Sequence, residues 1–175
     1  KEKRDYGDYW SASSAGYCMR KVIFDRMGVN KVEENPRKQR VFTAGHIFHQ
    51  WIQEITKNAG ISIAQELELQ DEDLMVRGHI DDLVLILPQH GVSIVEVGKP
   101  TIKAGHLILY DYKTQNSRAF SYKRPEMSHF HKMQLGTYMY MLRNQKQRLD
   151  GLPEDAGAVR RGLKEARILK ISKAN

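Results

Sequence analysis

The stretch Leu107-Ile-Leu-Tyr-Asp-Tyr-Lys-Thr114 predicts a β-strand that combines an apolar body with two charged side chains. Alternate side chains of a strand point to opposite faces, so Asp111 and Lys113 project from the face that Leu107 and Leu109 also occupy. A carboxylate and an ammonium group therefore share one site at the far end of this strand. The alternative interpretation is a surface salt bridge of little energetic value.

A second strand is predicted over 75–87, and Asp81 and Asp82 open its aliphatic part. A period of two places Asp81 on the face of the aliphatic side chains that follow it. Burying a lone carboxylate is costly unless it has a partner or a metal. If the two strands are neighbours, Asp81 and Asp111 converge with Lys113, and such an oxygen-rich pair suits Mg²⁺ or Mn²⁺. An aspartate at a solvated strand edge is the alternative.

The order of the predicted elements defines the fold class. Helices are expected over 11–28, 43–59 and 126–147, and strands over 61–69, 75–87, 92–97, 107–114 and 166–172. The helix over 43–59 has the clearest helical period, and we expect its apolar face to be buried against the rest of the protein. The order predicts an α/β fold in which helices flank a mixed central β-sheet. We expect one domain over 1–175, with an N-terminal helical segment (11–40) and a core (41–175).

The amino-acid composition favours a globular domain over a membrane-spanning, secreted or disulfide-bonded protein. The 175 residues are 41% hydrophobic and 28% charged, as in a globular domain, and no apolar run approaches the roughly 20 residues that span a bilayer. The charged first residues lead into no apolar segment of the kind found in secretion signals. The single cysteine, Cys18, excludes an intrachain disulfide. We therefore expect no membrane partner and an intracellular location, in the cytoplasm or at the nucleoid.

Charge is distributed unevenly around a formal net charge of +7. The segment 113–148 holds eight basic residues and one acidic residue, whereas 66–82 holds seven acidic residues and one basic residue. This pattern indicates a protein that binds a polyanion together with a hard cation, and an unevenly charged solvated surface is the alternative. Cations and rings interleave in part of the basic tract, which suits stacking and backbone contacts with single-stranded DNA. These residues are Arg118, Phe120, Tyr122, Lys123 and Arg124.

Two helical positions add polar groups near the predicted strands. His49 lies just beyond the apolar stripe of its helix and can reach a site beside the sheet, although a solvated histidine is the alternative. Gln134 and Tyr138 are four residues apart on an apolar face. A glutamine there needs hydrogen-bonding partners, so it either meets another polar group in the core or faces a site.

Four spaced motifs follow one another along the chain: Gly45-x-x-x-His49, Gly78-x-x-Asp81, Asp111-Tyr112-Lys113 and Gln134-x-x-x-Tyr138. Taken in this order, on a helix, two strands and a helix, they resemble the PD-(D/E)XK nuclease superfamily. The resemblance is to its RecB-type branch, which includes the CRISPR-associated exonucleases of the fourth Cas family and related phage nucleases. It covers Ser11 to Ser172 and implies a restriction-endonuclease-like core.

The resemblance implies a role for each matched residue. It implies that Mg²⁺ or Mn²⁺ is held by the side chains of His49, Asp81 and Asp111 and by the carbonyl of Tyr112. Lys113 would orient or deprotonate the attacking water and offset charge on the phosphate. Gln134 and Tyr138 would position the DNA or Lys113, and Arg20 would contact DNA. Glu66 is a candidate accessory carboxylate.

The implied activity is metal-dependent phosphodiester hydrolysis. The combined expectation is a deoxyribonuclease, an exonuclease that prefers single-stranded DNA or frayed ends and serves recombination, repair or CRISPR and phage DNA processing. Two alternatives stay open: a catalytically silent nucleic-acid-binding subunit, and a restriction-type endonuclease on the same core. The sequence does not determine the oligomeric state, and an oligomer is compatible with it.

One feature of that branch is not matched. Cys18, in the segment 13–20, corresponds to the first of four cysteines that hold an iron-sulfur cluster in the branch. A cluster needs about four thiolates and this chain has one, so we expect no cluster here. Either the chain lacks a C-terminal part of the domain or this member has no cluster. Cys18 is then expected to be a small buried hydrophobic residue.

Overall fold

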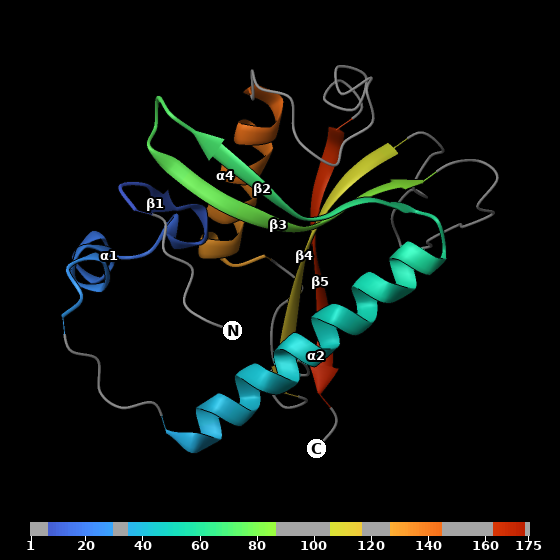
Figure 1. Cartoon of the computed structure of the whole chain (residues 1–175), viewed down its shortest axis with the longest axis horizontal. Helices are drawn as coiled ribbons and strands as arrows, with labels where there is room; N and C mark the ends of the chain where they lie inside the picture. Colours follow the sequence, from blue (N-terminus) through green and yellow to red (C-terminus); the bar gives the residue numbers. More distant parts are fainter. Residues whose placement is uncertain (1–6, 30–34, 87–105, 117–126, 145–162, 174–175) are drawn as a thin grey trace.

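A strongly twisted mixed β-sheet organises the chain (Figure 1). The computed structural model describes residues 7–29, 35–86, 106–116, 127–144 and 163–173. Within these residues the sheet has five strands: β1 (Trp10–Ser11), β2 (Ser62–Asp71), β3 (Val76–Ile86), β4 (His106–Asn116) and β5 (Leu163–Lys173). The predicted α/β class and mixed central sheet are therefore confirmed.

The strand β3 pairs with three other described strands. One of them lies along one edge of β3, and the other two share the opposite edge. β2 pairs antiparallel with one edge of β3. On the other edge, β1 pairs parallel with Val76 and Arg77, and β4 pairs antiparallel with residues 82–86. Between these two pairings, the edge of β3 faces no described strand. Beyond Tyr110, β4 pairs only with β5 among the described strands, so β3 and β4 separate and form a fork.

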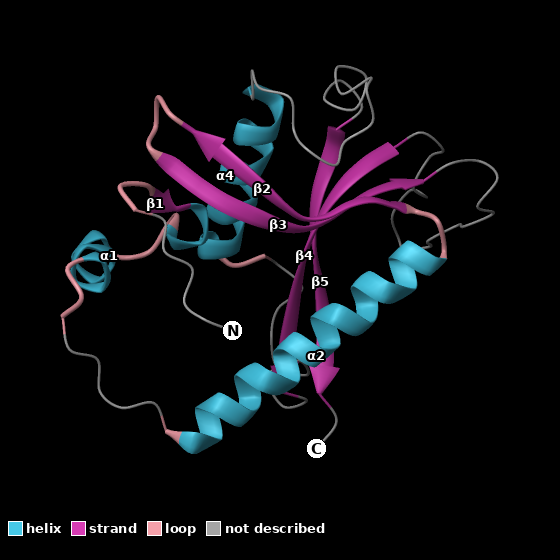
Figure 2. Ribbon diagram, in the orientation of Figure 1, coloured by secondary structure: helices cyan, strands magenta, loops and turns pink. Residues whose placement is uncertain are grey.

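Two helices cover opposite faces of the sheet (Figure 2). The helix α4 (His129–Asn144) packs on one face and encloses the main apolar core, to which β2, β3 and β4 contribute the fully buried Leu69, Leu83 and Leu109. The long helix α2 (Pro36–Asn58) crosses the other face. A small second cluster around Val84 and Ile108 belongs to that face. The site described below lies where the fork opens between α2 and α4.

The helix α2 begins earlier than its apolar pattern predicts. Asn35 caps its N-terminus, because the Asn35 side chain accepts a hydrogen bond from the N–H of Arg37 at 2.9 Å. Pro36 occupies the first turn, where its missing N–H costs nothing. The polar composition of 30–40 predicts a connection between two helices, but residues 36–40 belong to α2.

Most of the apolar stripe of α2 is not buried, contrary to expectation. Ile47, Trp51 and Ile55 are exposed, and Ile52 is the buried apolar residue of this helix. The side of α2 that meets the sheet instead carries His49, Gln53 and Thr56, whose partners are polar groups of β2, β3 and β4 (described below). The helix is thus fixed to the sheet largely through hydrogen bonds.

The predicted helix over 11–28 is wrong in its first half. There the chain forms β1, the 3-10 turn η1 (Ala12–Ser14) and a bend at Gly16, and the helix α1 covers only Met19–Arg26. Gly16 has φ +84°, and a Cβ there would lie 3.0 Å from two side-chain atoms of Met133. A left-handed residue against α4 interrupts the helix.

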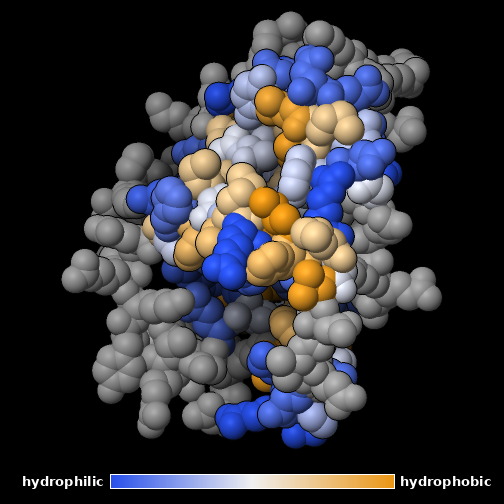
Figure 3. All heavy atoms as spheres, turned by 90° about the vertical axis from the view of Figure 1, so that its left-hand side faces the viewer, coloured by the Kyte–Doolittle hydropathy of each residue, from blue (hydrophilic) through white to orange (hydrophobic). Residues whose placement is uncertain are grey.

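The helix α1 lies on the surface, and none of its residues is buried. Its apolar side chains are displayed on the face shown in Figure 3. Cys18, which immediately precedes α1, is exposed, so the expectation of a buried Cys18 is wrong. The segment is too short to bury an apolar stripe against the sheet.

The remaining predicted elements agree with the structure within a few residues. The strands expected over 61–69, 75–87, 107–114 and 166–172 are β2, β3, β4 and β5, and the helix expected over 126–147 is α4. The short strand expected over 92–97 lies outside the described residues. In the part of the chain that the structure describes, no helix is both long enough and apolar enough to cross a membrane.

Candidate active site at a fork in the sheet

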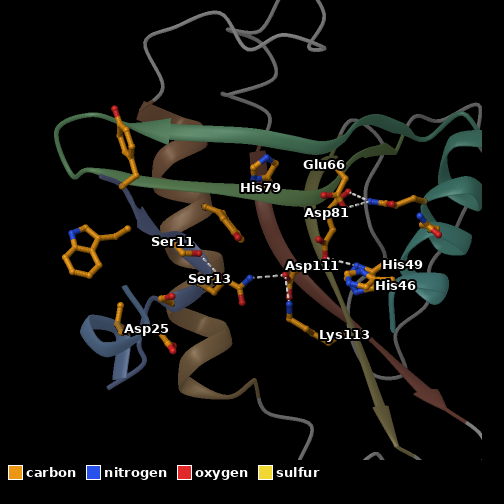
Figure 4. Close-up of a pocket in the computed structure, with 18 of the residues that line it drawn as sticks. Ser11, Ser13, Asp25, His46, His49, Glu66, His79, Asp81, Asp111 and Lys113 are labelled. Carbon is orange, nitrogen blue, oxygen red and sulfur yellow. Dashed lines mark hydrogen bonds and ion pairs between the residues drawn. The ribbon is translucent and has the colours of Figure 1, made fainter. Parts of the chain in front are cut away.

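Asp81 and Asp111 stand at the branch point of the fork. The last described pairs of the β3–β4 ladder match Asp82 with Tyr110, so Asp81 and Asp111 would form the next pair if the ladder continued. The strands separate here, and Asp81 Oδ2 accepts a hydrogen bond from the backbone N–H of Tyr112 at 2.7 Å. The Asp81 carboxylate thus accepts the hydrogen bond of a backbone N–H that no longer pairs with β3. Both side chains line the same cleft (Figure 4).

Asp111 is the most enclosed acidic group of the cleft. It is 3% exposed, and its Oδ1 accepts hydrogen bonds from Lys113 Nζ at 2.9 Å and from Gln134 Nε2 at 3.1 Å. Its Oδ2 is buried and has no hydrogen-bond partner among the described residues. The predicted pairing of Asp111 with Lys113 on one face of the strand is confirmed. Gln134, from α4, holds Asp111.

Burial, together with the charges of this cluster, shifts the pKa of two side chains. Burial, followed by the nearby carboxylate of Asp111, raises the pKa of Asp81 to about 7, although the Tyr112 N–H and Lys113 oppose the shift. Burial and the charge of Lys113 lower the pKa of His49. At neutral pH the site therefore holds a neutral imidazole and one carboxyl that is ready to lose its proton.

His49 approaches the acids from α2. Its Nδ1 lies 3.7 Å from Asp81 Oδ2, and its ring meets the ring of Tyr112 edge to face with centroids 5.9 Å apart. Glu66 lines the same cleft from β2, where its φ of +50° marks an irregular backbone, and Gln53 Nε2 lies 3.4 Å from Glu66 Oε1. The expected approach of His49 to the sheet is confirmed.

Gly78 and Tyr138 are linked by close packing. A Cβ at Gly78 would lie 2.7 Å from Tyr138 Cε1 and 2.8 Å from the Cβ of Ala12. Gly78 therefore lets the ring of Tyr138, from α4, and the turn η1 approach β3 closely. Tyr138 is buried in the main core and also reaches the cleft. Its position is determined by packing as much as by the cleft.

The cleft has a volume of about 1170 Å³ and a second wall that the sequence analysis did not identify. This wall is formed by residues 7–26, with Ser11, Ser13 and Asp25 across the cleft from the acids (Figure 4). Arg26 also lines the cleft. The guanidinium of Arg26 lies 4.4 Å from the ring centroid of Trp10. The run of serines was the only local signal, because the wall depends on the long-range pairing of β1 with β3.

Of the residues predicted to bind DNA, the structure describes Arg20 alone. Arg20 lies on the exposed helix α1, with its guanidinium over the ring of Phe24, and is not among the described residues that line the cleft. Arg118, Phe120, Tyr122, Lys123 and Arg124 lie outside the described residues.

Whether the cleft can bind a divalent cation depends on the ligand atoms that its side chains offer. Among the described residues, no three His, Cys, Asp or Glu side chains come together in an arrangement that could hold a metal ion. A closed cage is not required for Mg²⁺, which is usually bound through one or two carboxylates, water and substrate phosphates. The buried unpartnered Oδ2 of Asp111 and the adjacent carboxyl of Asp81 fit such an open site.

Comparison of the chain with protein-family models, with curated proteins and with solved structures gives no match.

Proposed function

We propose that this chain is a divalent-metal-dependent deoxyribonuclease with a restriction-endonuclease-like core. In this proposal it is an exonuclease that prefers single-stranded DNA or frayed ends. The supporting observation is the fork itself, where two neighbouring strands deliver Asp81, Asp111 and Lys113 to one cleft. One buried carboxylate oxygen of Asp111 has no hydrogen-bond partner among the described residues. A module that only bound nucleic acid would have no need of two buried acids, which are costly to place together.

Asp111 and Asp81 would hold Mg²⁺ or Mn²⁺, with the neutral imidazole of His49 as a further donor. When bound, the cation would polarise the scissile phosphate and lower the pKa of a bound water. Gln134 and Lys113 occupy Oδ1 of Asp111, which leaves Oδ2 as the free ligand atom. The carbonyl of Tyr112 remains a proposed ligand from the resemblance alone.

Lys113 would serve the water and the phosphate. Asp111 fixes its ammonium group at 2.9 Å, on the same strand face and in the same cleft, while the Lys113 side chain stays partly exposed. A cation held in this way can offset negative charge that develops on the phosphate and can hold the attacking water. Glu66 would be an accessory carboxylate at the β2 side of the cleft.

The preference for single strands is proposed from the interleaved rings and cations of 118–124 and from the net charge of +7. The described cleft adds Trp10 and Arg26 on its second wall. Stacking requires unpaired bases, which duplex DNA offers only at frayed ends.

The experiment uses end-labelled DNA in four forms: linear or circular, and single- or double-stranded. Each is incubated with Mg²⁺, with Mn²⁺ and with EDTA. The proposal predicts metal-dependent digestion of linear single strands, with circles of both kinds spared. Cutting of closed duplex circles would favour the restriction-type alternative. Binding of all forms without any cleavage would favour the silent binding subunit.

A further inference from the structure

A further carboxylate, Asp82, is buried beside the candidate active site. Asp82 is 0% exposed and adjoins Asp81 on β3. Its partners in the described part of the chain are three hydroxyl groups: Thr56 Oγ1 at 2.6 Å, Ser62 Oγ at 2.5 Å and Tyr112 Oη at 2.8 Å. These donors come from α2, β2 and β4. A single buried carboxylate therefore connects the helix and the three strands that surround the fork.

Alternation along β3 changes at this point. Ile80 and Leu83 both belong to the main core next to α4, although residues three apart on a regular strand point to opposite faces. Asp82 bonds to α2, on the other side of the sheet, while Asp81 lines the cleft. Regular alternation after Ile80 would have put Asp82 on the side of the main core, so the irregularity is what turns Asp82 towards α2.

Tyr112 connects Asp82 to the site residues. Its hydroxyl donates to Asp82, its backbone N–H donates to Asp81 Oδ2, and its ring lies against the ring of His49. One residue therefore contacts two of the proposed metal ligands and is itself held at its far end by Asp82. Displacement of the Tyr112 ring would alter both contacts.

The same hydrogen-bond network fixes α2 to the sheet. Gln53 Nε2 donates to the backbone oxygen of Asp81 at 2.8 Å, and Gln65 Nε2 donates to the backbone oxygen of Gln53 at 2.6 Å. Gln65 Nε2 also lies 3.2 Å from Thr56 Oγ1. Because the apolar stripe of α2 is exposed, these directional bonds determine where the helix places His49 relative to Asp81.

We propose that Asp82 is a positioning residue of this site: by holding the Tyr112 hydroxyl, it keeps the Tyr112 N–H against Asp81 and the Tyr112 ring against His49. The inference rests on the proposed function, since it assigns Asp82 to the support of that same metal site. Groups that orient metal ligands typically change metal affinity about 10- to 100-fold when they are removed. An apolar residue would fill the space but would give Tyr112 no fixed partner.

The test compares Tyr112→Phe and Asp82→Asn with a matched control, Ser62→Ala, which also removes a hydroxyl partner of Asp82 but leaves Tyr112 in place. The first readout is the backbone amide resonance of residue 112, recorded in a two-dimensional NMR spectrum of the metal-free protein. The second is Mn²⁺ affinity, measured by titration with paramagnetic resonance. Tyr112→Phe keeps the ring and so provides a milder variant if Asp82→Asn does not fold.

We expect Tyr112→Phe and Asp82→Asn to move the backbone amide of residue 112 upfield and to weaken Mn²⁺ binding about 10- to 100-fold. Ser62→Ala should leave the amide in place and change Mn²⁺ affinity less than about twofold, while lowering the melting temperature. An unmoved amide in Tyr112→Phe, or an equal loss of Mn²⁺ affinity in Ser62→Ala, would overturn the inference. Absence of Mn²⁺ binding by the wild-type protein would contradict the proposed function, and the amide readout would still decide the role of Asp82.

Discussion

The backbone N–H of Tyr112 donates a hydrogen bond to the side chain of Asp81 at 2.7 Å, across the point where β3 and β4 separate. In a continuous ladder this edge would be closed by backbone pairing. Here a carboxylate bridges the two strands, and the space beside it is the cleft that also receives Asp111 and Lys113. The relationship explains how two acids on neighbouring strands come together without a closed ladder between them.

Lys113→Met should abolish DNA cleavage and leave Mn²⁺ affinity unchanged or increased. The ammonium group is placed to serve water and phosphate, and its positive charge opposes a cation bound by Asp111. Calorimetric titration with Mn²⁺ and a cleavage assay on the same sample separate the two effects. Lys132→Met, on the exposed side of α4, is the control and should retain activity. Loss of Mn²⁺ binding in Lys113→Met would show that the lysine supports the metal ligands instead.

Asp81 should make the metal-free protein less stable as pH rises. Its pKa is about 7 in the folded chain and near 4 in an unfolded one, so folding favours the protonated form. Its contribution to the free energy of unfolding is full below about pH 4 and is lost as pH rises through about 7. Urea denaturation between pH 5 and pH 8 should show this decline in the wild-type protein and a flatter profile in Asp81→Asn. Equal slopes in the two proteins would contradict the burial of this carboxyl.

Ionisation of Asp81 should also control metal affinity, which should rise with pH while the stability of the metal-free protein falls. Binding of Mn²⁺ requires ionised Asp81, so affinity should fall by up to about tenfold for each pH unit below 7. Titrations at several pH values measure this slope. A flat profile between pH 5 and pH 7 would remove Asp81 from the ligand set.

Gly78→Ala should destabilise the protein by about 1 to 3 kcal/mol, because the added methyl group would overlap the Tyr138 ring and Ala12. Gly136→Ala is the matched control. Gly136 lies within α4 with no atom within 4 Å of an added Cβ, so the change should raise stability by up to about 1 kcal/mol. Thermal unfolding of both variants provides the comparison, and equal melting temperatures would contradict the close packing at Gly78.

Several features of the fold follow from local patterns, whereas others depend on distant contacts. The period of two predicted that Asp111 and Lys113 share a face, and their 2.9 Å contact confirms it. The apolar stripe of α2 predicted the wrong face of this helix to be buried, because the face that packs against the sheet is largely polar. Asp82 has the same local pattern as Asp81, and only the tertiary structure shows that it meets three hydroxyls. Apart from a run of serines, no local pattern indicates that residues 7–26 complete the cleft.

Phe120→Ala and Tyr122→Ala should weaken binding to single-stranded DNA by about 1 to 3 kcal/mol each, because each ring is proposed to stack on a base. Substitution of Lys3 or Arg4 should have a smaller effect. Fluorescence anisotropy with a labelled oligonucleotide in EDTA measures binding without cleavage. Affinity should also fall with salt, with a log-log slope near -0.7 for each phosphate neutralised. Unchanged affinity in both ring variants would remove this segment from the binding surface.

The most direct measurement is the rate at which a 5′-labelled linear single strand is digested in Mn²⁺ by the wild-type protein and by Asp111→Asn. The substitution keeps the size of the side chain and removes the charge of the buried ligand oxygen. We expect digestion by the wild-type protein, none in EDTA, and a loss of about a thousandfold or more in a folded Asp111→Asn protein. Digestion by Asp111→Asn at the wild-type rate would contradict the assignment of the fork between β3 and β4 as the active site.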